Sequence, residues 1–213
     1  MDKKTIRTPQ EKQVYDKSYY RGRHSNYIFW YHNLKYHIFW ARRLGILKKA
    51  ATSGKILDVG CAFGFFIKLL EKEFKVYGID ISSYAIEKAA NVVSHPERVK
   101  CCDIHHGIPF NETFDAITAF DIMEHIRDPV NVFSILHKAL KKGGSLYLEF
   151  PIAKTLVNFD RGHYYRPLEK WINYLRQAGF KLWSTKYYYT VGLRAVMIPA
   201  IRNVNYCSIV VKK

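Results

Sequence analysis

The sequence lacks the features that mark several other classes of protein. No run approaches the roughly 20 uninterrupted apolar residues that span a bilayer, and Met1 to Lys4 lack the apolar core of a signal peptide. The four cysteines include no C-x-x-C pair, which is the spacing of many zinc and redox sites. We therefore expect a cytoplasmic protein without a transmembrane segment, with reduced thiols and with neither a disulfide nor a zinc site.

Positive charge is concentrated at the two ends of the chain. The net charge is +16 at pH 7. Residues 1–50 hold 12 basic and 3 acidic residues, residues 51–150 hold 11 and 13, and residues 151–213 hold 11 and 2. A clustered basic surface attracts polyanions, whereas dispersed charge mainly confers solubility. RNA is therefore kept as an alternative partner of the two basic flanks.

From Lys55 onward, short strand-like runs alternate with helical patterns. Strands are predicted at residues 55–59, 75–79, 98–102, 114–120, 145–150, 180–189 and 206–212. Helices are predicted at about 64–73, 83–93, 129–141 and 167–178. This alternation is typical of a parallel sheet wrapped by helices. At 213 residues, the chain suits one α/β domain with its own core.

An aromatic and basic region precedes the first predicted strand. Ten Tyr, Phe and Trp residues fall between Tyr15 and Trp40, and their spacing predicts one or two amphipathic helices reaching to about residue 50. The simplest interpretation is a helix that covers one edge of the sheet. The alternatives are a lid over the active site, a platform for the substrate, or a dimer contact. We therefore divide the chain into a helical cap at 1–50 and one structural unit at 51–213, as a monomer or a homodimer.

A glycine-containing turn follows the first strand. Asp58, Val59 and Gly60 lead through residues 61–63 to Gly64, where a helix is predicted to begin. Glycine lets the backbone turn tightly and approach a ligand, and a helix N-terminus offers free N–H groups. A ligand carboxylate suits that place. The turn does not contain the G-x-G-x-x-G fingerprint of NAD enzymes, but a glycine turn alone does not identify its ligand.

Two further acidic residues follow the next two predicted strands. Asp80 ends the second strand, 22 residues after Asp58, where a carboxylate can accept both hydroxyls of a ribose. Asp103 ends the third strand, where a carboxylate can accept the amino proton of an adenine. Ligands of open α/β sheets bind outside the carboxyl ends of the strands. The three acids are therefore predicted to line one crevice.

With these motifs, the chain resembles the class I methyltransferases that use S-adenosyl-L-methionine (SAM), and specifically the small single-domain group that includes quinone-biosynthesis methyltransferases. The resemblance is close over residues 55–150 and looser to about residue 180. Residues 114–125 resemble the family's fourth-strand motif, and residues 140–146 resemble the turn before its fifth strand. The resemblance implies an α/β, Rossmann-like sheet of seven mostly parallel strands, with helices on both faces and the last strand antiparallel.

The resemblance also implies how SAM is held at the first strand. Asp58, Gly60 and Gly64 would hold the methionine end of the cofactor. Ala62 stands where the family usually carries glycine. Its methyl group narrows the turn slightly, which affects the details of cofactor placement.

The remaining cofactor contacts follow from the other motifs of the family. Asp80 would bind the ribose, with Ile81 against the adenine, and Asp103 and Ile104 would flank the base. The complete predicted set of cofactor contacts is Asp58, Gly60, Cys61, Ala62, Phe63, Gly64, Asp80, Ile81, Asp103, Ile104, Phe120 and Asp121.

Two histidines are the candidates for a catalytic base. Methyl transfer from a sulfonium is an in-line displacement, so the enzyme mainly aligns the acceptor and excludes water. A base helps when the acceptor is a hydroxyl or an acidic carbon. His125 follows the fourth strand, and His163 lies beyond the fifth. For each of them, support of the surrounding loop is the alternative role.

The fourth-strand motif also has the spacing of a metal site. Asp121, Glu124 and His125 form a D-x-x-E-H pattern, which is similar to the E-x-x-E-H that binds magnesium in some quinone and small-RNA methyltransferases. A site this small would need substrate oxygens or waters to complete six ligands. We therefore expect no metal.

Three functions remain open. The first is transfer of a methyl group from SAM to a small, aromatic or lipid-like acceptor beneath a cap formed by the N-terminal region and residues 151–166. The second is RNA methylation, in which the basic flanks follow phosphates and aromatic residues stack on bases, although no Asn-Pro-Pro-Tyr motif follows the fourth strand. The third is a SAM-binding pseudoenzyme or interaction protein whose basic flanks bind a membrane or a partner.

Overall fold

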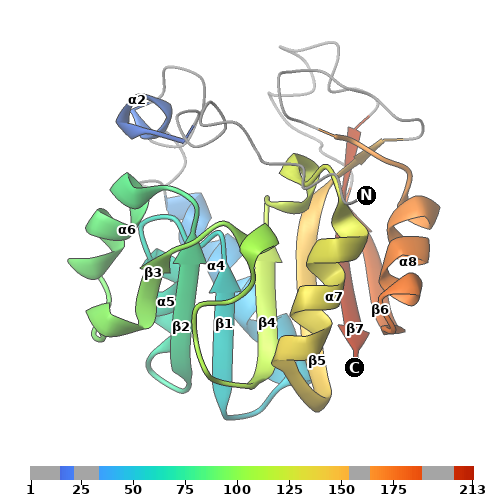
Figure 1. The fold of residues 1–213 in the computed structure, drawn as a ribbon, viewed down its shortest axis with the longest axis horizontal. Helices are drawn as coiled ribbons and strands as arrows, with labels where there is room; N and C mark the ends of the chain where they lie inside the picture. Colours follow the sequence, from blue (N-terminus) through green and yellow to red (C-terminus); the bar gives the residue numbers. More distant parts are fainter. Residues whose placement is uncertain (1–14, 22–33, 154–163, 189–203) are drawn as a thin grey trace, which may run out of the picture.

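The computed structural model describes residues 15–21, 34–153, 164–188 and 204–213. Seven strands form one sheet in the order β3-β2-β1-β4-β5-β7-β6 (Figure 1). The strands are β1 (Lys55–Val59), β2 (Lys75–Asp80), β3 (Val99–Cys101), β4 (Phe114–Phe120), β5 (Leu140–Ala153), β6 (Lys181–Tyr188) and β7 (Val204–Lys212). Strand β7 is antiparallel to both of its neighbours, and the pairs from β3 to β5 are parallel. The predicted sheet with a reversed last strand is confirmed.

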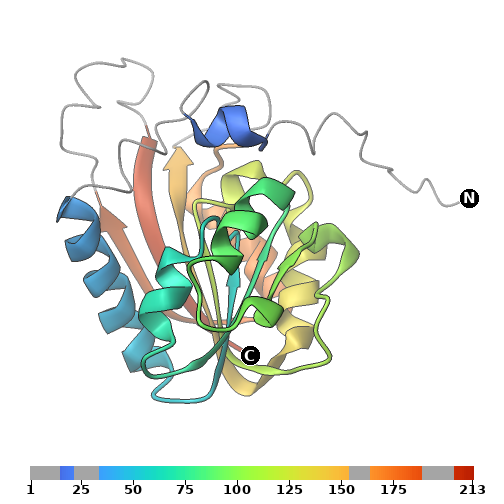
Figure 2. The same ribbon diagram turned by 90° about the vertical axis from the view of Figure 1, so that its left-hand side faces the viewer.

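Helices cover both faces of this sheet. The helices are α2 (Lys17–Tyr20), α4 (Leu34–Ala50), α5 (Phe65–Leu70), α6 (Ser83–Ala90), α7 (Pro129–Ala139) and α8 (Leu168–Gln177), with short 3₁₀ turns η1 (Pro96–Arg98), η2 (Ile104–His106) and η3 (Met123–His125). Figure 2 shows α4 and α7 on opposite sides of the sheet. Two apolar clusters match this arrangement, because α7 and α8 pack in one and α4, α5 and α6 in the other.

Helix α4 lies on a face of the sheet. The simplest interpretation of the N-terminal region, which expected a helix over one edge of the sheet, is wrong for this helix. Leu47 is fully buried and packs in the same cluster as Ile56 of β1, Tyr147 of β5 and Val210 of β7. The hydroxyl of Ser145 also donates to the carbonyl of the last helical residue (3.0 Å). The helix is thus part of the domain core. None of the described helices is both long and apolar enough to cross a membrane.

Several boundaries differ from the predictions because tertiary contacts decide where elements end. The helix predicted at 64–73 ends at Leu70, and that predicted at 83–93 ends at Ala90. The strand predicted at 145–150 runs from Leu140 to Ala153, since its pairing with β4 begins at Leu140 and its pairing with β7 continues to Ala153. Strand β4 has the predicted bounds.

Candidate functional site

The order in which the strands are added to the sheet reverses beside β1. Strands β2 and β3 follow on one side of β1, and β4 and β5 lie on the other. In open α/β sheets, this switch point, outside the carboxyl ends of the strands, is where ligands bind. Asp58 of β1 and Asp80 at the end of β2 are both buried there, at 4% and 7% exposure, and Asp121 directly follows β4. The structure therefore places Asp58, Asp80 and Asp121 at the carboxyl ends of β1, β2 and β4, a region that we call the crevice.

The turn after β1 depends on glycine at position 60. Gly60 has a φ of 74°, and its N–H donates to the carbonyl of Ile79 (2.8 Å). A Cβ at this position would lie 2.0 Å from Cδ1 of Ile122, which belongs to the segment after β4. A side chain at position 60 would therefore require the side chain of Ile122 to move. Gly64 also has a φ of 74°, and a Cβ there would meet Val93 at 2.8 Å.

Ala62 adopts the left-handed conformation in which glycine is favoured. Its φ is 48°, and its N–H donates to Oδ2 of Asp80 (2.9 Å). An alanine in this region costs about 1–2 kcal/mol relative to right-handed backbone. Alanine thus departs from the family's glycine but keeps the backbone shape that glycine would have there.

The carboxylate of Asp80 joins the turn after β1 to the segment after β2. Besides the Ala62 N–H, it accepts the N–H of Ser82 at Oδ1 (2.8 Å). Burial raises the pKa of Asp80 to about 6, against the effect of these backbone donors. Each carboxylate oxygen can accept more than one hydrogen bond, so this arrangement retains acceptor capacity for the two hydroxyls of a ribose.

Asp58 lies in the same apolar surroundings. The Thr118 hydroxyl donates to its Oδ1 (2.7 Å). Burial raises the pKa of Asp58 to about 7, with the negative charge of Asp80 adding to the rise and the Thr118 hydrogen bond opposing it. The positive charge of Arg43 also opposes the rise. A buried acid whose pKa is raised by a second acid beside it favours a further cation nearby. The electrostatics of this half of the crevice suit a positively charged ligand.

Asp103 follows β3 instead of ending it, because β3 ends at Cys101. Asp103 caps η2: its Oδ1 accepts the backbone N–H of His105 (3.0 Å) and lies 2.8 Å from Nδ1 of the same residue. Ile104 is buried in the apolar cluster beneath α7, and Ile81 is half-buried. Their predicted contacts with adenine stay predictions.

Sequence reasoning missed the residues that hold Asp121. Asp121 has a φ of 57°, which is unusual for a residue other than glycine. Its carboxylate accepts hydrogen bonds from Nη2 of Arg43 (3.2 Å) and from the Tyr206 hydroxyl. Nε of Arg43 also donates to Glu149 of β5 (2.8 Å), and the guanidinium carbon lies 4.1 Å from the centroid of the Phe120 ring. Helix α4 is thereby connected to the segment after β4.

One signal in the sequence pointed to Arg43. On α4, positions 40, 43 and 47 are spaced as one face of a helix, and Trp40 and Leu47 pack against the sheet. An arginine on such an apolar face needs a buried acid as a partner. That partner could not be identified without the fold.

Glu124 and His125 lie together in η3, after β4. Glu124 is 4% exposed, and within the described residues its Oε2 has no hydrogen-bond partner. Burial, and next the charge of Asp121, raise the pKa of Glu124 well above its usual range. His125 is half-buried, and its ring lies 5.6 Å from that of Tyr15. Sequence reasoning singled out His125 as a base but gave Glu124 no role in catalysis.

Two other predictions concern this side of the crevice. His163 lies outside the described residues. Among the residues that are described, no group of three acidic, histidine or cysteine side chains could hold a metal ion.

Helix α2 lies above the carboxyl end of the sheet (Figures 1 and 2), and it brings aromatic residues to that end. Tyr20 is 5% exposed, and its ring is 4.8 Å from that of Phe63 in the glycine turn. Burial, followed by the charges of Glu124, Asp121 and Asp80, raises the pKa of Tyr19 to about 12. The acids that raise the pKa of Tyr19 therefore come from the segment after β4 and from the end of β2. Helix α2 thus contacts the turn after β1.

With this geometry in place, comparison with known proteins decides the family. A family model described as a methyltransferase domain matches residues 31–191. The chain belongs to this family. The resemblance to class I SAM-dependent methyltransferases is thereby confirmed.

Curated relatives match the chain only in part. A ubiquinone biosynthesis O-methyltransferase of Coxiella burnetii is 31% identical over 111 residues, which cover 49% of this chain and 47% of the relative. The same enzyme of Pectobacterium atrosepticum is 29% identical over 118 residues, with the same shares covered. The chain spans about half the length of the curated relatives it matches.

Solved structures confirm the fold. A phosphoethanolamine N-methyltransferase 2 of Haemonchus contortus, in complex with SAM, has a TM-score of 0.68 at 20% identity, over 92% of this chain and 59% of that one. The cyclase SpnF has a TM-score of 0.66, also at 20% identity, over 81% of this chain and 80% of that one. Because one of these proteins is named as a methyltransferase and the other as a cyclase, the reaction must be argued from the site.

Proposed function

We propose that this protein binds SAM in the crevice and transfers its methyl group to a small-molecule acceptor. One observation carries the proposal: Asp58 and Asp80 are buried at the ends of adjacent strands, beneath a turn whose Gly60 leaves no room for a Cβ. A ligand there meets close backbone and two carboxylates. SAM supplies an activated methyl group on a sulfonium and carries an amino group and a ribose, which are groups that these carboxylates can bind.

Each half of the crevice has its own task in this proposal. Asp80 would accept the ribose hydroxyls while it holds the turn through Ala62. Asp58 would contribute negative charge that favours the cationic cofactor. Tyr19 and Tyr20 of α2 would then cover the site and exclude water from the displacement.

On the acceptor side, we assign proton removal to His125. It is half-buried, follows β4 at the ligand-binding end of the sheet, and contacts Tyr15 beneath the region of α2. Burial and the charge of Asp121 raise the pKa of the adjacent Glu124 well above its usual range, which favours its protonated form. A neutral carboxyl can donate a hydrogen bond, so we place it as a donor toward the acceptor or toward a water molecule beside it.

The tyrosines over the crevice favour a small, aromatic or lipid-like acceptor. The rings of Tyr15, Tyr19 and Tyr20 form consecutive edge-to-face contacts that end at His125 and Phe63. The names of the curated relatives, which are O-methyltransferases of ubiquinone biosynthesis, agree with this class of acceptor. The same proposal includes a cytoplasmic location and an oligomeric state of either monomer or homodimer.

An assay of product formation tests the proposal. The protein is incubated with SAM and with a panel of hydroxylated aromatic compounds, lipid-linked phenols and bulk RNA, and S-adenosylhomocysteine is measured. We expect product with a phenolic acceptor, and loss of that product in His125→Ala with SAM affinity retained. If product formed only with RNA, the acceptor would be RNA and not a small molecule. No product with any acceptor, together with an absence of SAM binding, would contradict the proposal.

A further inference from the structure

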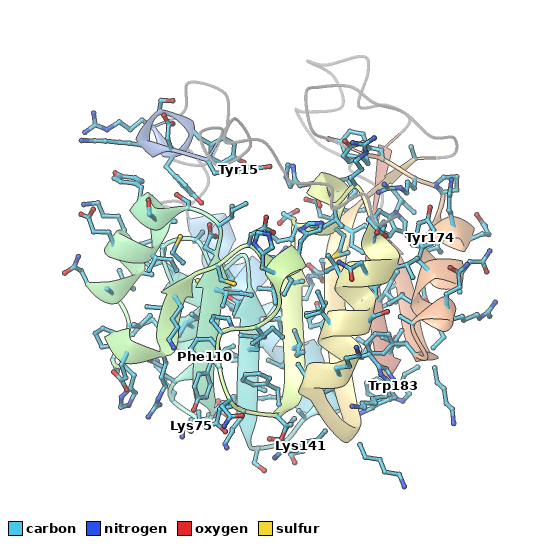
Figure 3. All side chains as sticks on the ribbon, in the orientation of Figure 1. Tyr15, Lys75, Phe110, Lys141, Tyr174 and Trp183 are labelled. Atoms are coloured by element: carbon cyan, nitrogen blue, oxygen red, sulfur yellow. The ribbon has the colours of Figure 1, made fainter. Side chains whose placement is uncertain are left out.

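A group of basic residues lies at the end of the molecule opposite the crevice. We call it the basal patch, and it consists of Lys138, Lys141, Lys142, Arg176, Lys181, Lys212 and Lys213. Figure 3 shows Lys141 and Trp183 at the lower end of the molecule, away from Tyr15 at the upper end.

Backbone pairing and side-chain contacts connect the lysines of the patch, and Arg176 lies in the last turn of α8. Lys181 of β6 pairs with Lys212 of β7. Nζ of Lys213 donates to the carbonyls of Lys138 (3.4 Å) and Leu140 (2.7 Å). The carbonyl of Lys213 accepts the N–H of Gly143, which directly follows Lys141 and Lys142. The patch is therefore continuous from the end of α7 to the free edge of the sheet.

The positive charge of the patch is almost unopposed. Lys141 forms a salt bridge with Asp115 (2.8 Å). In the described ranges of the chain, the other six residues form no salt bridge with an acid. The field of the patch also reaches its surroundings: burial lowers the pKa of His137, and the charge of Lys213 lowers it further.

Two apolar side chains are exposed beside these charges. Of the three large apolar side chains exposed in the described residues, Leu182 and Trp183 are adjacent and lie on β6, at 44% and 49% exposure. Strand β6 is the last strand of the sheet, and the register shifts at Trp183. Nζ of Lys212 lies 5.0 Å from the centroid of the Trp183 ring. The exposed leucine and tryptophan thus follow Lys181 on β6 and lie beside Lys212, whose Nζ also donates to the carbonyl of Ala50 (2.9 Å) and to the hydroxyl of Ser145 (2.6 Å).

We propose that the basal patch binds an anionic lipid surface. Lysines near such a surface are attracted by its negative potential, and tryptophan and leucine enter the boundary between headgroups and acyl chains. The patch supplies both groups together. It lies at the end of the sheet where α7, α8 and β7 finish. An end of the molecule can approach a flat surface.

Other partners fit the same residues less well. A nucleic acid base would stack on the face of Trp183, but Lys212 lies over that ring, and six of the seven basic residues are lysines, not the arginines typical of base recognition. A second copy paired along β6 would bring Lys181 and Lys186 of both copies together, and like charges across strands destabilise pairing. Lipid is therefore the occupant that we favour.

Vesicle co-sedimentation of the full chain tests this inference. The probes are vesicles of phosphatidylcholine alone and vesicles that also contain phosphatidylglycerol. We expect binding only to the anionic vesicles, and its loss at high salt. The variant Lys138→Gln/Lys142→Gln/Lys181→Gln should weaken that binding on the order of a hundredfold, since each lysine near the surface contributes about a fivefold factor. The variant Leu182→Ser/Trp183→Ser should weaken it independently of salt.

A matched variant controls for net charge. Lys88→Gln/Lys100→Gln/Lys170→Gln removes the same charge from a half-exposed position on α6 and from exposed positions on β3 and α8, and it should bind the anionic vesicles as the unmodified protein does. Equal binding by the two triple variants, or equal binding to both kinds of vesicle, would overturn the inference. So would a single-stranded RNA that binds through the patch while the vesicles do not, or a dimer that dissociates in Leu182→Ser/Trp183→Ser without vesicle binding.

The inference does not depend on the proposed function. The crevice lies at the other end of the sheet, so the patch variants should keep the SAM affinity of the unmodified protein. Loss of vesicle binding with SAM affinity intact would report on the patch alone. A protein that binds vesicles through the patch but does not bind SAM would support this inference and contradict the proposed function.

Discussion

The two halves of the crevice are held in place by different kinds of contact. On the cofactor side, Asp80 is held by backbone N–H groups of Ala62 and Ser82, which are 18 and 2 residues away in sequence. On the acceptor side, Asp121 is held by the side chains of Arg43 and Tyr206, from 78 and 85 residues away. The first half is therefore a local backbone structure, and the second depends on side chains that only the complete fold assembles.

This contrast predicts that substitutions will separate cofactor binding from catalysis. Changes to the turn after β1 should affect SAM affinity. Changes to the buried ion network should affect the acceptor side and the stability of the fold.

The largest effect is expected for Arg43→Met. It removes the buried guanidinium from Glu149 and Asp121, and breaking a buried ion pair costs about 3–5 kcal/mol. Because Nη2 of Arg42 still donates to both oxygens of Glu149 (2.7 and 2.8 Å), we expect the lower end of this range, about 3 kcal/mol. We expect urea unfolding to show a loss of this size, and turnover to fall more than SAM affinity does. Arg43→Lys, which keeps the charge but not the geometry, should lose less stability and still lose turnover. Equal loss of SAM affinity and turnover in the lysine variant would break the contrast between the two halves.

Gly60→Ala should have the next largest effect, and on the other half. Its Cβ would overlap Cδ1 of Ile122, and φ is positive, so we expect a loss of about 2–4 kcal/mol in unfolding free energy. SAM affinity should fall with it. The control is Gly45→Ala in α4, where a Cβ meets nothing within 4 Å, and alanine should stabilise that helix by about 0.5–1 kcal/mol. Normal SAM affinity in Gly60→Ala would show that the turn does not approach the cofactor.

Asp58→Asn should change how stability depends on pH. The pKa of Asp58 is raised to about 7 in the folded protein from an ordinary value near 4. The folded state therefore holds a proton that the unfolded state has lost, and its stabilising effect disappears as pH rises from about 4 through 7. Urea unfolding at pH 5 and pH 8 should show that the unmodified protein loses about 1–3 kcal/mol more than the variant over this range. The same loss in both proteins would mean that Asp58 titrates normally.

The smallest effect is expected for Ala62→Gly. Glycine relieves the left-handed strain at a φ of 48° but adds freedom to the unfolded chain. We expect a gain of about 0.5–1 kcal/mol in thermal or urea unfolding, with SAM affinity unchanged. A loss of stability would indicate that the alanine methyl group contributes packing with Tyr20 and Ala85, with which it shares an apolar cluster.

The same contrast explains what could be read from the sequence. Strands β1 and β4 were predicted with their observed bounds, because each is a short apolar run between turn residues. The glycine turn and Asp80 were predictable because their relation is local. Asp103 was expected to end a strand that in fact ends at Cys101, since the 3₁₀ turn that it caps leaves only a weak pattern.

The acceptor side was not predictable in the same way. Arg43, Glu149 and Tyr206 come from α4, β5 and β7, and no local pattern connects residues 78 to 106 positions apart. The unusual backbone of Asp121 is likewise a consequence of these contacts. An arginine on the apolar face of α4 was the only local sign of the network within the described part of the chain.

The central claim is tested most directly by calorimetric titration of SAM into the unmodified protein and into Asp80→Asn. The control is Glu87→Gln, which makes the same change of carboxylate to amide at an exposed position on the neighbouring helix α6. We expect the unmodified protein and the control to bind SAM alike, and Asp80→Asn to bind at least about tenfold more weakly, which corresponds to 1.4 kcal/mol. Equal affinity of all three proteins, or no binding by any of them, would contradict the account.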